Sequence, residues 1–183
     1  METLRSAKPR CEGSIPSVAS CLDFNNMDFF EVVKKRHCCR NFNLKKKVNL
    51  RDLKRIIDSG KMAPSAGAFY PTKFRVIRDR KLKEEIAEVS SGGKDFLADA
   101  PIVLVIYSDV EKTASYYGER GRNLYVICDA SAAAENMFLA ATALGLSTCW
   151  IGAFDEEKVA KLLNLKENQR PMVIMPIGYP SRI

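Results

Sequence analysis

The chain has 183 residues, of which 46% are hydrophobic and 28% are charged, a composition typical of one soluble globular domain with room for a full core. Its net charge of +7 comes from 29 basic and 22 acidic residues, and solubility alone accounts for most of that excess. Because the sequence has no long basic run with interleaved aromatic residues, a phosphate-bearing small molecule fits the charge better than a nucleic acid does.

The beginning of the chain differs in composition from the rest. It holds two prolines, several serines and equal numbers of acidic and basic residues, and it lacks the continuous apolar core of a signal peptide. We therefore expect residues 1–26 to form a poorly ordered tail and residues 27–183 to form a single domain.

Beyond this tail, helix and strand patterns follow one another without a regular alternation. The predicted helices cover residues 28–35, 50–59, 79–91 and 156–163, with Asn49 and Asp155 as N-caps of the second and the last. The predicted strands cover residues 73–77, 102–107 and 172–178. We interpret residues 109–121 as a charged connection. Because the sequence lacks both GxGxxG and the P-loop pattern, we expect a layered α+β fold.

The stretch that organises the chain is LYVICDASAAAENMFLAATALGLSTCWIGA, residues 124–153. Its first part, up to Leu144, combines bulky apolar residues with many alanines and has no polar face, so we expect one long buried helix. Asp129, Glu135 and Asn136 would be unpaired in lipid, which argues against a membrane span.

The segment Arg-His-Cys-Cys-Arg, residues 36–40, places two guanidinium groups and an imidazole close together. Two such arginines repel each other unless an anion or water lies between them, and arginine forks match phosphate oxygens. A solvated helix end explains the same pattern equally well. His37 lacks a Ser, Asp or Glu partner nearby in the sequence, so we do not expect it to be a catalytic base.

Two further stretches could bring backbone groups close to a ligand. Residues 64–67, Pro-Ser-Ala-Gly, form a tight loop of small residues that could approach a flat molecule, and a simple turn explains them as well. Gly145 ends the predicted central helix, and a short buried strand follows that finishes in Ile151-Gly152. The amides of this strand end could face a ligand, or the strand could simply end in the core.

The six cysteines and the single histidine predict neither a metal site nor a disulfide framework. No CxxC pair occurs, so the clustered ligands of a tetrahedral zinc site are absent from the sequence. We expect free thiols in a reducing cytosol, and therefore a cytoplasmic protein. Cys128 and Cys149 lie in the most apolar region of the chain, and we expect both to be buried.

Taken together, these stretches resemble the nitroreductase-like family of flavin-dependent oxidoreductases. RHCCRNF, residues 36–42, is similar to the family's Arg-x-Ser-x-Arg-x-Phe motif, and residues 128–154 resemble its central helix with the following strand end. PMVIMPIGYP, residues 171–180, resembles its closing strand. The resemblance covers about residues 27–181. It implies an α+β nitroreductase-like fold, with a mixed or antiparallel central sheet flanked by helices and a long buried helix at a dimer core.

The resemblance also implies FMN as the cofactor, NADH or NADPH as the electron donor, and a homodimer that holds two FMN molecules at its interface. The two arginines and the histidine of segment 36–40 would bind the FMN phosphate, the loop 64–67 would line the isoalloxazine ring, and the strand end would face its reactive edge. Cys38 stands where the family usually has serine. The implied cofactor-binding residues are Arg36, His37, Cys38, Arg40, Pro64, Ser65, Ala66, Gly67, Ile151, Gly152 and Arg182.

For the reaction, the resemblance implies that electrons pass from NAD(P)H through flavin N5 to a small acceptor, such as a nitro compound or a quinone, in a ping-pong cycle. Because the chemistry is centred on the flavin, no catalytic side chain is expected, and no metal, nucleic acid or membrane partner is expected either.

The loop departs from the commoner nitroreductase pattern, because Ala68 and Tyr70 replace its Asn and Gln. This loop and the stretch TyrGlyGluArgGlyArg, residues 117–122, look more like the branch that contains the azoline-oxidising peptide dehydrogenases. Two alternatives therefore stay open: a flavin-dependent dehydrogenase that oxidises a peptide or small metabolite, and a flavin-binding module without turnover.

Overall fold

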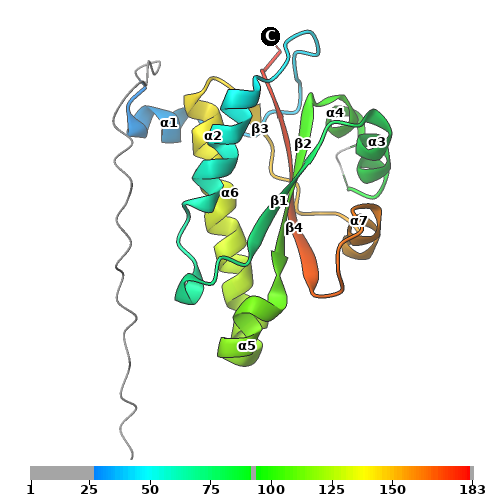
Figure 1. Cartoon of the computed structure of the whole chain (residues 1–183). Coiled ribbons are helices and arrows are strands. Elements are labelled where there is room, and N and C mark those ends of the chain that lie inside the picture. Colours follow the sequence, from blue (N-terminus) through cyan, green and yellow to red (C-terminus); the bar gives the residue numbers. More distant parts are fainter. Residues whose placement is uncertain (1–26, 92–93, 182–183) are drawn as a thin grey trace, which may run out of the picture.

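The structure is a computed structural model that describes residues 27–91 and 94–181 (Figure 1). The predicted tail, residues 1–26, and Arg182 lie outside the described residues. The helices are α1 (Phe29–Lys35), α2 (Leu50–Lys61), α3 (Arg80–Glu88), α4 (Lys94–Asp99), α5 (Val110–Arg120), α6 (Val126–Ala143) and α7 (Glu156–Leu162), with a 3-10 turn η1 (Ala66–Ala68) and a π-helical turn η2 (Gly121–Tyr125). The strands are β1 (Thr72–Ile77), β2 (Ile102–Asp109), β3 (Ser147–Thr148) and β4 (Gln169–Gly178).

The strands form one sheet in the order β1-β2-β4-β3, and every neighbouring pair is antiparallel. A register shift between Ile106 and Tyr107 marks an irregularity in the β2–β4 pair, next to Pro171 in β4. Such an irregularity lets a strand accept a proline, which has no N–H to give to the ladder. Beyond β3, Cys38 adds a short parallel bridge to Thr148, so the sheet edge is mixed. The predicted α+β fold is confirmed.

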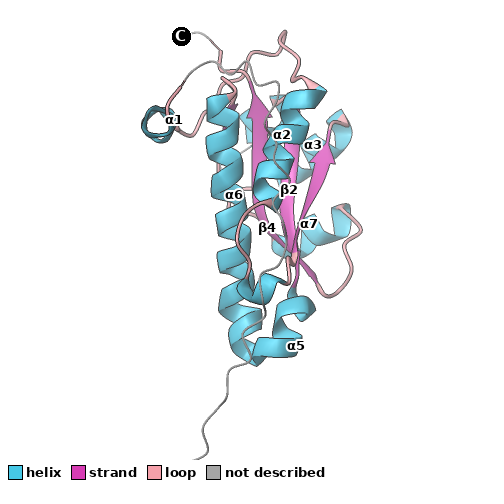
Figure 2. Ribbon diagram, turned by 60° about the vertical axis from the view of Figure 1, so that its left-hand side comes forward, coloured by secondary structure: helices cyan, strands magenta, loops and turns pink. Residues whose placement is uncertain are grey.

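Helices cover both faces of the sheet (Figures 1 and 2). Helices α2 and α6 pack on one face against Ile102, Leu104 and Ile106 of β2, and α3, α4 and α7 pack on the other against Val103 and Val105. Side chains alternate between the faces along a strand, so β2 has five consecutive buried residues because each face is covered. This explains why residues 102–107 are the strongest strand signal in the sequence.

The charged connection predicted for residues 109–121 is wrong, because these residues form α5 and begin η2. Val110, Thr113 and Ala114 are buried at helical spacing beneath an otherwise charged surface. Gly118 interrupts the helix with φ of +56°, a left-handed conformation that suits glycine. A Cβ on Gly121 would lie 2.5 Å from the backbone oxygen of Thr113, so the turn closes tightly only because residue 121 has no side chain.

The central helix is α6, and only one of its sides is covered by the rest of the described chain. Ala130, Ala134, Met137 and Phe138 face the sheet and α2, whereas Leu124 in the preceding turn and Ile127 are each 40% exposed. Cys128 is also exposed, so the expectation that it is buried is wrong, while Cys149 is buried as predicted.

The only described helical stretch that is long and apolar enough to span a membrane, by length and composition alone, is Val110–Ala143. It comprises α5, η2 and α6 and is interrupted at Gly118. Because α6 packs on α2 and the sheet, we interpret the stretch as a core helix with its entry turn.

Candidate functional site

The segment 36–40 follows α1 and is fixed to the sheet edge by backbone hydrogen bonds. The Cys39 N–H donates to the Thr148 carbonyl at 2.8 Å, beside the bridge between Cys38 and Thr148. The residue after this segment is also held, because the Ser181 N–H donates to the Asn41 carbonyl at 3.0 Å. Arg36 and Arg40, the first and last residues of this segment, therefore extend from a backbone that hydrogen bonds hold in place.

The two arginines and the histidine of this segment have few hydrogen-bond or ion-pair partners among the described residues. The Nε of Arg36 lies 4.0 Å from Oε1 of Glu135, a long and partly exposed contact that contributes little. Arg40 is exposed and donates no hydrogen bond to another described residue. His37 holds its Nδ1 2.9 Å from the Lys35 carbonyl, which can only accept, so Nδ1 carries the proton and Nε2 is the nitrogen available to a ligand.

This donor set fits a phosphate group. The two guanidinium groups provide N–H donors and positive charge, which is the chemistry that phosphate oxygens require. Cys38 lies in the same place and offers a thiol, a weaker donor than the serine hydroxyl of the usual motif.

Cys149 lies behind this segment and is 1% exposed. Burial, and next the contact with the Cys38 thiol, raise the pKa of Cys149 to about 11 from an ordinary 9.0. A thiol with this pKa stays protonated at neutral pH, so Cys149 serves as a small buried side chain and not as a nucleophile. Within the described residues, no group of three or more His, Cys, Asp or Glu side chains is arranged to hold a metal ion.

Of the two strand-end residues, only Gly152 keeps its backbone groups available. The N–H and carbonyl of Ile151 both bond to Ile174 of β4, each at 3.0 Å, so they serve the sheet. Gly152 is exposed, and its N–H and carbonyl form no backbone hydrogen bond with another described residue. Beside it, Trp150 is 39% exposed and stacks on Phe138 of α6, with 5.9 Å between the ring centroids.

The loop 64–70 lies on a different side of α6 and is bonded to Asp129. The Ser65 hydroxyl donates to Oδ2 of Asp129 at 2.7 Å, and the Ala66 N–H donates to Oδ1 at 3.0 Å. A cavity of about 290 Å³ opens beside this loop. Its lining residues are Gly60, Lys61, Ala63, Pro64, Ser65, Tyr70, Thr72, Phe74, Asp129 and Ala133.

Sequence reasoning did not place Asp129 in the site. The one feature of the sequence that pointed to Asp129 was an acidic residue among small apolar residues, because such a residue needs hydrogen-bond partners if it is buried. The partners could not be identified, because Ser65 lies 64 residues earlier in the chain.

Within a single chain, the described site residues that the sequence predicted form two groups that lie apart from each other. Segment 36–40 pairs with Thr148, four residues before Gly152, and reaches α6 at Glu135, whereas loop 64–67 reaches α6 at Asp129. Six residues separate these two positions on α6 (135 minus 129), which corresponds to about 9 Å along the helix and about 120° around it. Figure 1 shows the first group near the end of α6 that lies beside α1, and the loop after α2 further toward α5.

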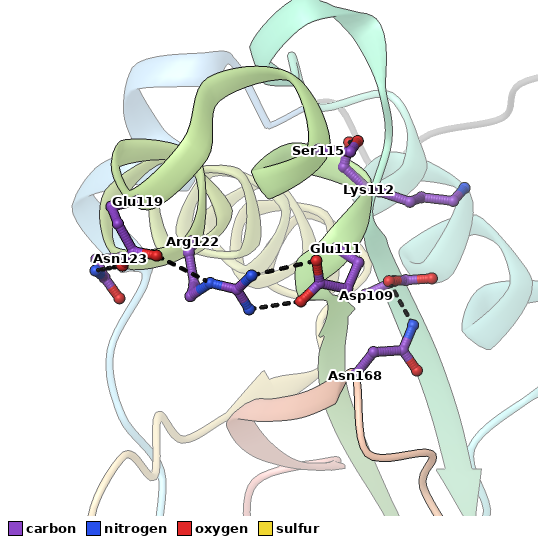
Figure 3. A network of polar contacts seen from close by, with 8 residues as sticks. All are labelled: Asp109, Glu111, Lys112, Ser115, Glu119, Arg122, Asn123 and Asn168. Atoms are coloured by element: carbon purple, nitrogen blue, oxygen red, sulfur yellow. Dashed lines mark hydrogen bonds and ion pairs between the residues drawn. The ribbon is translucent and has the colours of Figure 1, made fainter.

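A second group of polar side chains ties α5 and η2 to the start of β4 (Figure 3). Arg122 reaches both Glu111, with one N–H donating at 3.2 Å, and Glu119, while Asn168 donates to Asp109 at 2.8 Å. A cavity of about 460 Å³ lies next to this group, and its four acidic and four basic lining residues balance in charge. We therefore assign no ligand to it.

Comparison with known proteins places the chain in a family. The model of the nitroreductase family matches residues 33–93 and 90–179. A Methanothermobacter thermautotrophicus protein, named as a candidate NADH dehydrogenase/NAD(P)H nitroreductase, is 29% identical over 163 residues, which cover 86% of this chain and 80% of that protein. The crystal structure of a nitroreductase family protein from Clostridium novyi NT is 31% identical, with a TM-score of 0.77 over 85% of this chain and 86% of that one. An FMN-dependent nitroreductase from Clostridium difficile R20291 is 26% identical, with a TM-score of 0.72 over 83% and 87%.

Proposed function

Because the chain belongs to the nitroreductase family of oxidoreductases, we propose that it is an FMN-dependent enzyme that passes electrons from NADH or NADPH to a small acceptor. The acceptor would be a nitro compound, a quinone or a molecule of similar chemistry. The observation that carries this proposal is the segment 36–40, whose backbone is fixed while Arg36 and Arg40 keep their donors almost without partners. Such a segment is suited to a phosphate ester.

In this proposal, the residues of the chain bind and orient the cofactor and do not transfer protons. Arg36 and Arg40 would hold the phosphate, His37 would add a donor at Nε2 only when its ring carries a second proton there, and the N–H of Gly152 would face the ring edge. When bound, FMN supplies the redox chemistry, taking a hydride from NAD(P)H and giving two electrons to the acceptor in a ping-pong cycle. The positive charge of segment 36–40 would offset the negative charge of the phosphate.

We further propose that the working form is a cytoplasmic homodimer with two FMN sites. The uncovered side of α6 is mainly apolar, and Leu124, Ile127 and Cys128 lie on it. Burying this side against a second copy removes apolar surface from water. In such a dimer, loop 64–67 of one copy would lie near segment 36–40 of the other, so each FMN site would be built from residues of both copies.

An absorbance spectrum of the purified protein tests FMN binding. We expect the visible bands of bound flavin, directly or after addition of FMN, and their bleaching on anaerobic mixing with NADH or NADPH. A protein that stays colourless after FMN is added contradicts the proposal. Flavin that is reduced by a peptide or metabolite but not by NAD(P)H favours a flavin-dependent dehydrogenase instead. The loop supports that alternative, because Ala68 and Tyr70 stand where the commoner nitroreductase pattern has Asn and Gln.

A matched pair of variants isolates the phosphate contact. Arg40→Gln removes a guanidinium from segment 36–40 and weakens FMN binding by about tenfold or more, the usual scale of a charge-assisted pair. Lys45→Gln removes the same charge from an exposed position outside the segment and leaves FMN affinity unchanged. Equal affinities of the two variants would show that the phosphate lies elsewhere.

A further inference from the structure

Asp129 is a buried carboxylate whose described partners all belong to one loop. Its residue is 7% exposed and lies on the side of α6 that faces the core. One carboxylate oxygen accepts from the Ser65 hydroxyl and the other from the Ala66 N–H. A buried carboxylate is costly unless it is hydrogen-bonded, so this loop cannot leave α6 without stranding the charge.

Ser65 extends the connection to the far end of the loop. Its Oγ donates to Asp129 and accepts from the Tyr70 N–H at 3.0 Å. The carboxylate, the hydroxyl and the Tyr70 amide therefore form a chain of hydrogen bonds across the loop. A backbone bond from the Ala68 N–H to the Ser65 carbonyl, at 3.0 Å, closes the turn inside it.

The loop that is held in this way has an unusual backbone. Gly67, Ala68 and Tyr70 have φ of +59°, +56° and +48°, all in the left-handed region. Glycine enters that region freely, but alanine and tyrosine do so at a cost and keep it only when their surroundings impose it. The turn also fits closely against α5, because a Cβ on Gly67 would lie 2.9 Å from the hydroxyl of Tyr117.

We propose that Asp129 is the positioning residue of loop 65–70: its carboxylate imposes the left-handed backbone and so sets the face that the loop presents to the cofactor. That Asp129 holds the loop in place follows from the hydrogen bonds above. Only the effect on the cofactor rests on the proposed function. In this proposal Asp129 acts through Ser65 and Ala66.

Amide hydrogen exchange, followed by NMR on the full chain without added cofactor, tests the hold. In Asp129→Ala, the Ala66 amide loses its acceptor, and Ser65 Oγ, the acceptor of the Tyr70 amide, loses the carboxylate that holds it. We expect exchange at both amides to become about tenfold faster or more while the β2 amides stay protected. Asp129→Asn keeps an oxygen for Ala66 and an amide for Ser65, so it restores most of the protection.

The matched control is Asn136→Ala, which removes another side-chain hydrogen bond of α6, from Asn136 Nδ2 to the Ser59 carbonyl at 3.2 Å. We expect no change at Ala66 or Tyr70 in this variant. Equal exchange at these amides in Asp129→Ala and Asn136→Ala would overturn the hold. If Asp129→Ala does not fold, Ser65→Ala decides, because it leaves the bond from the Ala66 N–H to Asp129 in place. The Ala66 amide must then stay protected while the Tyr70 amide becomes exposed to exchange, and loss of protection at both amides overturns the proposal.

FMN titration, read by flavin fluorescence, tests the second step. We expect Asp129→Ala to weaken FMN binding by about tenfold, because a loop that is not preorganised must be ordered on binding, and Asp129→Asn to remain close to wild type. Wild-type affinity in Asp129→Ala overturns the effect on the cofactor. A wild-type chain that binds no FMN refutes the proposed function instead, and the exchange result still decides the hold on the loop.

Discussion

Replacing Ile127 by aspartate separates two copies of this chain if they pack along the uncovered side of α6. The side chain is 40% exposed, and it lies in the first turn of the helix. Because the side chain is partly exposed and has solvent beside it in the single chain, an aspartate is tolerated there and the single chain keeps its fold. The same carboxylate is unfavourable when it is buried against a second copy.

The size of the effect follows from the exposed fraction. Complete burial of an isoleucine contributes about 1.5–3 kcal/mol, so covering the remaining 40% contributes about 0.6–1.2 kcal/mol per copy. A two-fold axis repeats the contact, which gives about 1.2–2.4 kcal/mol, or a dissociation constant about 8 to 60 times higher without the isoleucine. Aspartate adds a desolvation cost, so this range is a lower bound.

Sedimentation velocity over a series of protein concentrations measures the dissociation constant, and the visible absorbance of each boundary reports its flavin content. Leu50→Asp is the matched control, because Leu50 is 62% exposed in the first turn of α2, outside α6 and outside the proposed cofactor-binding residues. We expect dimer and flavin to be lost together only in the Ile127 variant. A monomer with a full complement of flavin, or an unchanged dissociation constant, would refute the reasoning.

Two further predictions concern stability. Among the described residues, Thr113 Oγ1 is a buried oxygen without a hydrogen-bond partner, so Thr113→Val should raise the free energy of unfolding by about 1 kcal/mol and the Tm by about 2–4 °C in calorimetry. A lower Tm would mean that the hydroxyl is satisfied. Burial raises the pKa of Cys149 to about 11 from 9.0, so the folded protein keeps a proton that the unfolded chain releases as the pH rises above 9. Urea titrations should therefore show wild type losing about 2 kcal/mol relative to Cys149→Ala between pH 9 and 11, and parallel curves would contradict the raised pKa.

The elements that local signals specify were predicted well. Asn49 and Asp155 cap α2 and α7 as predicted, since a cap depends on residues two or three positions away. The predicted strand after Gly145 is shorter than expected: β3 keeps only Ser147–Thr148, and Ile151 pairs separately with β4. Helix α5 was missed because Gly118 and a charged surface hide its short buried side.

The candidate site depends on distances that sequence patterns do not contain. The bond between Ser65 and Asp129 joins residues 64 positions apart, and no pattern within either stretch indicates the other. The assignment of residues 36–40 and 64–67 to the cofactor stays a prediction. The structure adds that these two segments attach to different sides of α6, which depends on helix packing and not on the residues of either motif.

The spacing along α6 constrains how this chain can change in length. One residue inserted between Asp129 and Glu135 turns everything after it by about 100° around the helix axis. Such an insertion would carry Glu135 away from Arg36, or pull Asp129 away from the loop, whatever residue was added. A substitution in this interval alters packing locally and gradually. A single insertion or deletion instead breaks either the contact of Arg36 with Glu135 or the hydrogen bonds of the loop with Asp129.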